Sequence, residues 1–157
     1  VWVGVSDLEA GMSPAEFGSE LQEIVAPLRA LHAQVLVANV EPITDAIAYQ
    51  ACAGVQGPPP QSDNSRCFVA RRFAGDRVPP ADTVSAVLAA FDSQVAAVAQ
   101  RDGAVLVNVN SGLSQPTSTG PSLFSTDDFD LSTAGQALAA RLFLTAWRST
   151  GGRPSAS

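Results

Sequence analysis

The chain has 157 residues, of which 46% are hydrophobic and 15% are charged, a composition typical of one folded domain and not of a disordered chain. Its formal net charge is −6, and all nine basic residues are arginine, a balance that argues against nucleic acid or an anionic membrane as the main partner. The apolar runs are strand-sized, far below the roughly 18 residues that a membrane-spanning helix needs. The sequence therefore predicts a protein with no membrane span.

Three β-branched runs predict short buried strands, at residues 1–5, 35–40 and 104–109. None of them alternates with polar residues, which is typical of strands in a parallel sheet that is covered on both faces.

The first helix is predicted to begin after Ser13. Ser13 and Glu16 have the spacing of a capping box, with Pro14 at the first helical position. Apolar residues then recur at helical spacing as far as residue 31. Pro27 lies inside this pattern, so we expect it to kink or split the helix.

Two further helices have clear boundaries. Residues 81–102 carry a regular apolar stripe that ends at Gly103. The last helix is expected to follow Ser132, which has the chemistry of an N-cap. A shorter helix is predicted near residues 45–53.

Strands and helices that alternate in this way predict an α/β protein with a parallel sheet and helices on both of its faces. Ligands of such folds bind at the carboxyl ends of the strands, where we expect residues 6–7, 41–42, 110–112 and 125–130 to meet. A chain that opens directly in a buried strand indicates the second part of a larger doubly wound domain. We expect that domain to cover residues 1–148, followed by a flexible tail at 149–157.

Two cysteines, Cys52 and Cys67, flank a segment rich in Pro, Gly, Gln and Ser. Two cysteines are too few ligands for a metal site, and the chain holds a single histidine, His32. A disulfide bond between the two is the prediction, with two unpaired thiols as the alternative. A disulfide would place the protein outside the cytoplasm.

Three segments carry a family resemblance. Residues 2–8, Trp-Val-Gly-Val-Ser-Asp-Leu, resemble the third conserved block of the SGNH hydrolases (GDSL-type esterases and lipases), which reads Gly-x-Asn-Asp at a strand end. Residues 35–42 resemble the following strand and its proline-containing exit. Residues 125–135 are similar to the last block, Asp-x-x-His-Pro-Ser-x-x-Gly, which carries the Asp and His of the family's catalytic triad.

The resemblance implies a three-layer, flavodoxin-like α/β sandwich, here incomplete at its N-terminus, and a secreted enzyme that hydrolyses small-molecule acyl esters without a metal or other cofactor. Asp127 takes the place of the triad Asp, and Gly4 and Ser6 form the oxyanion rim, with Ser6 at the Asn position. Asp130 stands where the family has His, and the nucleophile block Gly-Asp-Ser has no counterpart. We therefore expect this chain to be inactive alone, the alternative being a non-catalytic binding or structural protein.

Plainer interpretations of these residues stand beside the functional ones. Ser6 is as readily a turn residue, since His32 is expected at the opposite end of the sheet and out of reach as its base. Asp127 and Asp130 suit the start of a helix through its dipole. Trp2 is expected in the core and Arg71-Arg72 in solvent. If a central strand is missing, the bare sheet edge predicts a homodimer.

Overall fold

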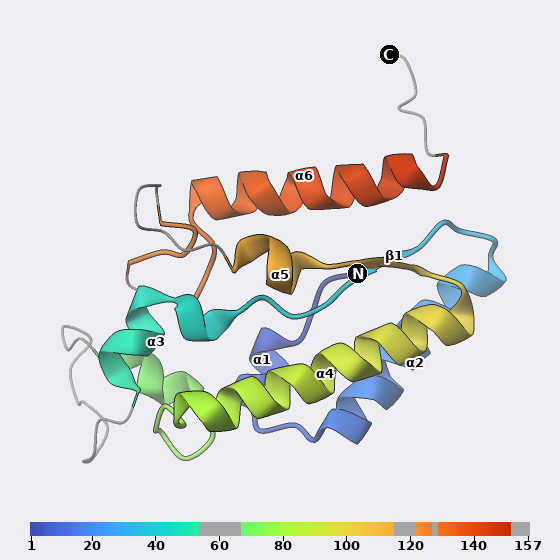
Figure 1. The fold of residues 1–157 in the computed structure, drawn as a ribbon. Coiled ribbons are helices and arrows are strands. Elements are labelled where there is room, and N and C mark those ends of the chain that lie inside the picture. Colours follow the sequence, from blue (N-terminus) through green and yellow to red (C-terminus); the bar gives the residue numbers. More distant parts are fainter. Residues whose placement is uncertain (54–66, 115–121, 127–128, 152–157) are drawn as a thin grey trace.

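The computed structural model describes residues 1–53, 67–114, 122–126 and 129–151 (Figure 1). The protein is mixed α/β and mostly helical, with a small parallel sheet. Strand β1 (Leu36–Ala38) pairs in parallel with β2 (Val105–Val107), so that Val37 lies opposite Leu106. The predicted parallel sheet is confirmed for the second and third apolar runs, although both strands are shorter than expected.

The first apolar run lies along the free side of β1 for only part of its length. The amino group of Val1 donates to the carbonyl of Leu36 at 2.6 Å, and Ala38 N–H donates to the carbonyl of Val1 at 3.0 Å. Val1 thus bonds to the two residues on either side of Val37, which is the pattern of a parallel ladder. The predicted strand over residues 1–5 is wrong: this run forms no strand, pairs with β1 only through Val1, and turns at Gly4 into helix α1 (Val5–Glu9).

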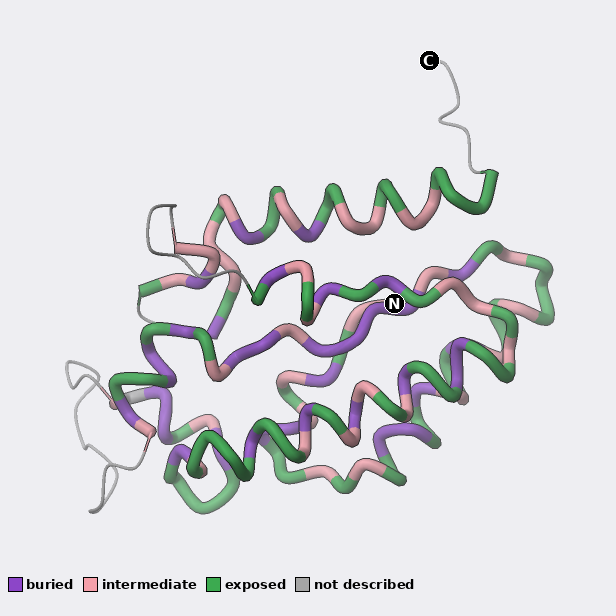
Figure 2. The backbone as a smooth tube through the Cα atoms, viewed as in Figure 1, coloured by how far each residue is buried: buried purple, intermediate pink, exposed green. Residues whose placement is uncertain are grey.

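Helices cover both faces of the sheet (Figures 1 and 2). On β1, Val37 packs into the core formed with α2 (Pro14–Ala30) and α4 (Ala81–Asp102). The flanking Leu36 and Ala38 belong to a second cluster with α6 (Thr133–Ser149). Alternate residues of a strand point to opposite faces, so three residues of β1 are enough to join two cores.

The predicted helix boundaries are confirmed where a capping residue sets them. Ser13 Oγ accepts from Glu16 N–H at 3.3 Å, Ser132 Oγ accepts from Gly135 N–H at 3.2 Å, and Gly103 ends α4 with a φ of 66°. The expected split at Pro27 is wrong, since α2 runs through it as one helix. Pro27 is exposed and lies in the last turn of α2.

The remaining helices are short. A 3-10 turn over Ile43–Asp45 leads into α3 (Ile47–Cys52), which confirms the short helix predicted near 45–53. A second 3-10 turn covers Phe68–Arg72. Helix α5 (Val109–Leu113) follows β2 almost at once and so shortens the predicted third strand. Among the described residues, no helix combines the length and apolar character needed to cross a membrane.

Candidate functional site

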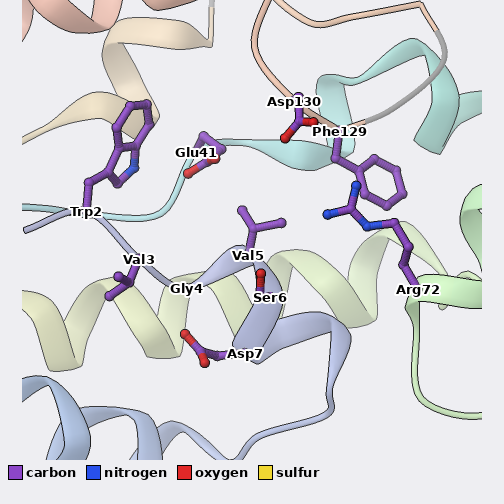
Figure 3. A pocket seen from close by; sticks show the side chains of 10 residues that line it. All are labelled: Trp2, Val3, Gly4, Val5, Ser6, Asp7, Glu41, Arg72, Phe129 and Asp130. Atoms are coloured by element: carbon purple, nitrogen blue, oxygen red, sulfur yellow. The ribbon is translucent and has the colours of Figure 1, made fainter.

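A cavity of about 440 Å³ opens where the first segment and β1 end (Figure 3). Its size lies within the range of small-molecule sites. It is lined by Trp2, Val3, Gly4, Val5, Ser6, Asp7, Glu41, Arg72, Phe129 and Asp130.

Most of the predicted rim meets in this cavity. Gly4, Ser6 and Asp130 all line it, whereas Asp127 lies outside the described residues. The third predicted segment, residues 110–112, is absent from the lining. Asn110 instead donates through its side chain to the carbonyl of Val40 at 3.1 Å, and this bond helps to hold α5 against the end of β1.

Gly4 shapes one wall of the cavity by turning the chain from the sheet into α1. Its φ is 131°, a conformation that side chains with a Cβ rarely adopt. A Cβ at this position would lie 2.5 Å from Cγ2 of Val40. Both the backbone angle and the lack of space for a Cβ therefore require glycine at this turn. The turn places Ser6 in the first turn of α1, where it is exposed to solvent.

The surroundings of Glu41 in the cavity wall shift the pKa of its carboxyl group. Burial raises its pKa, and the negative charge of Asp130 raises it further. A hydrogen bond from the Glu41 backbone opposes the shift, as does the indole N–H of Trp2, which points toward the carboxyl group without reaching full hydrogen-bond geometry (Figure 3). Glu41 thus holds its proton to a higher pH than an ordinary glutamate.

The opposite wall is built around Arg72. Its Nε pairs with Oε1 of the buried Glu9 at 2.9 Å, and its Cζ lies 5.5 Å from the ring centroid of Phe129. Phe129 in turn packs against Phe73, with 5.5 Å between the ring centroids. The expectation that Arg71-Arg72 is a solvated pair is therefore wrong for Arg72, which binds an acidic partner and an aromatic face.

The cavity contains neither an imidazole nor a metal site. His32 follows the end of α2 and does not contribute to the lining. Within the part of the chain that the structure describes, no group of three or more His, Cys, Asp and Glu side chains could hold a metal ion. Ser6 consequently has no histidine base in this cavity.

Cys52 and Cys67 are close neighbours. Both are thiols in the structure, and Sγ of Cys67 donates to the carbonyl of Ala51 at 3.4 Å. Burial, together with a hydrogen bond to Cys67, raises the pKa of Cys52 to about 12. The disulfide bond remains a prediction.

Comparison of the chain with protein-family models, with curated proteins and with solved structures finds no match in any of the three. The resemblance to SGNH hydrolases therefore rests on residues 2–8, 35–42 and 125–135.

Proposed function

We propose that this chain forms part of an SGNH-type hydrolase domain, that its cavity binds small acyl esters, and that the chain alone does not hydrolyse them. One observation carries the proposal. Gly4 and Ser6, from the segment that resembles the oxyanion block, line the same cavity as Asp130, from the segment that resembles the triad block. The two segments are more than a hundred residues apart in the sequence.

The scaffold that goes with this function is a three-layer, flavodoxin-like sandwich. Parallel pairing of Val1 with β1 and of β1 with β2 supports it, as do the helices on both sides of the sheet. The cavity at the carboxyl ends of these strands is the usual place for a ligand in such folds.

Two further residues shared with the last family block support the resemblance through their structural roles. Ser132 caps α6, and Gly135 lies so close to the preceding loop that a Cβ would be 2.0 Å from the carbonyl oxygen of Leu123. These roles give a physical reason for a Ser and a Gly at the spacing that the last family block has.

The missing chemistry explains why the chain should bind without turnover. Ester hydrolysis by a serine needs a base that takes the hydroxyl proton and then returns it to the leaving group. Asp130 stands at the position that the family gives to the histidine base, and a carboxylate is a far weaker base than an imidazole. The Ser6 hydroxyl can still donate a hydrogen bond to an ester carbonyl.

The first test is hydrolysis of p-nitrophenyl acetate and p-nitrophenyl butyrate by the purified chain. We expect a rate equal to that of buffer. Turnover that disappears in Ser6→Ala and survives in Ser19→Ala, an exposed serine on α2, would contradict the proposed inactivity.

A non-catalytic glycan-binding function is the second candidate. It is favoured by the indole of Trp2 lying on the same wall as the Glu41 carboxyl group, because aromatic faces and carboxylates are suited to sugar rings and hydroxyl groups. Calorimetric titration with ethyl butyrate and with methyl glycosides separates the two. The ester proposal predicts saturation by ethyl butyrate only.

A further inference from the structure

The wall of the cavity is rich in negative charge. Three carboxyl groups line it, those of Asp7, Glu41 and Asp130, against one guanidinium, that of Arg72. This guanidinium is already paired with a carboxylate, because its Nε lies 2.9 Å from Oε1 of Glu9. A ligand that enters the cavity therefore meets an excess of carboxylate.

These carboxyl groups are spread around the cavity and do not converge on one point. Asp7 comes from α1, Glu41 from the exit of β1, and Asp130 from the approach to α6 (Figure 3). The described residues contain no cluster able to hold a metal ion. The spacing suits a larger and more diffuse positive charge, such as a substituted ammonium group.

An aromatic ring completes the wall. The indole of Trp2 stands beside Glu41, and its ring is held by Phe143, with 5.8 Å between the ring centroids. Trp is the best aromatic partner for a cation, and quaternary ammonium groups are bound in this way. Carboxylates around the same space add a Coulombic attraction that an uncharged group of equal size does not receive.

We propose that the cavity selects esters that carry a substituted ammonium group over neutral and anionic esters of the same size. The inference rests on the proposed ester-binding function and adds a class of substrate to it. An anionic ligand would be repelled by Asp7 and Asp130 and could recover that cost only from Arg72, which is already engaged by Glu9.

The test compares acetylcholine with 3,3-dimethylbutyl acetate, in which a carbon atom replaces the charged nitrogen at nearly constant shape. By calorimetry or ligand-observed NMR at low salt, we expect acetylcholine to bind about tenfold more tightly. Equal affinities, or tighter binding of the neutral ester, would overturn the charge selection and leave the ester-binding proposal in place. If neither compound saturates the chain, ester binding fails as well.

Variants show whether the cavity is the source of the preference. Asp130→Asn should weaken acetylcholine binding about three- to fivefold and the neutral ester much less, since the substitution removes charge at nearly constant volume. Glu23→Gln removes the same charge from the exposed face of α2 and should affect neither ligand. The proposal would be contradicted if Asp130→Asn lost the same affinity for both esters. It would also be contradicted if Asp130→Asn and Glu23→Gln changed the affinity for acetylcholine equally.

Discussion

Gly4 shows how much one residue decides at this site. It sits between a segment that pairs with β1 and a helix that lines the cavity. Its φ is 131°, and Val40 occupies the space that a Cβ would need. The sequence predicts Gly4 at the rim by resemblance, and the structure adds the physical reason for a glycine there.

Gly4→Ala should lower the free energy of unfolding by about 2–4 kcal/mol, because it adds a left-handed backbone penalty to a steric clash. Gly75→Ala is the matched control: its φ is +82°, but nothing lies within 4 Å of the added Cβ. It should cost about 1 kcal/mol. Urea denaturation measures the free energy of unfolding of both variants. Equal losses in the two would mean that Val40 moves away from the added Cβ at no energetic cost.

Glu41 makes the stability of the protein depend on pH. Its pKa in the folded state is raised above the usual value of 4.5, because burial and Asp130 disfavour the charged form, while Asp7 and Arg72 share its cavity. Its contribution to stability is therefore fully present below pH 4.5 and is lost as the pH rises through the folded-state pKa. Glu41→Gln should flatten this fall in the free energy of unfolding, whereas Glu23→Gln should not. A wild-type slope retained in Glu41→Gln would exclude Glu41 as its source.

The residues that the sequence places wrongly depend on distant contacts. The local sequence predicts an exposed Arg72, and only the fold brings Glu9 and Phe129 into contact with it. Trp2 packs against the second core cluster, as its apolar run predicts, and the fold also makes it line the cavity. Glu41 follows a predicted strand, and that position is the one local signal that marks it as part of the rim.

At the scale of the elements, helices are predicted better than strands for a physical reason. Ser132 and Gly103 are local signals that set a helix end wherever the helix packs. A strand extends only as far as its neighbour pairs with it, and β2 ends where α5 begins at Val109. Apolar character alone therefore overestimates the lengths of the strands.

A disulfide bond between Cys52 and Cys67 would connect α3 to the 3-10 turn at Phe68–Arg72. We expect oxidised glutathione to convert the thiols of Cys52 and Cys67 into an intramolecular disulfide, with a mass loss of about 2 Da and a higher Tm. Mass spectrometry with and without reductant measures the bond. Two thiols that remain open to alkylation after oxidation and unfolding would contradict it, and would remove the support for the proposed secreted location.

At the scale of the whole molecule, several large apolar side chains of the described residues are exposed. Val3 in the first segment is 41% exposed, and the end of α2 with its C-cap residue presents Ile24, Leu28 and Leu31 with exposures of 46%, 38% and 77%. Contiguous apolar surface of this kind favours association.

We therefore predict self-association of the chain, with a homodimer through the edge at residues 1–3, measurable by sedimentation equilibrium. Val3→Lys should shift the chain toward monomer, while Thr145→Lys on the exposed face of α6 should not. A wild-type chain that stays monomeric across the accessible concentrations would count against an open sheet edge.

The central claim is that small esters bind between the turn at Gly4 and the loop before α6. Titration of ¹⁵N-labelled chain with ethyl butyrate, followed by amide chemical shifts, tests it most directly. We expect saturable shifts at residues 4–7, 41 and 129–130, with no change at the far end of α2. Saturable shifts confined to another surface, or none at millimolar ester, would contradict the account.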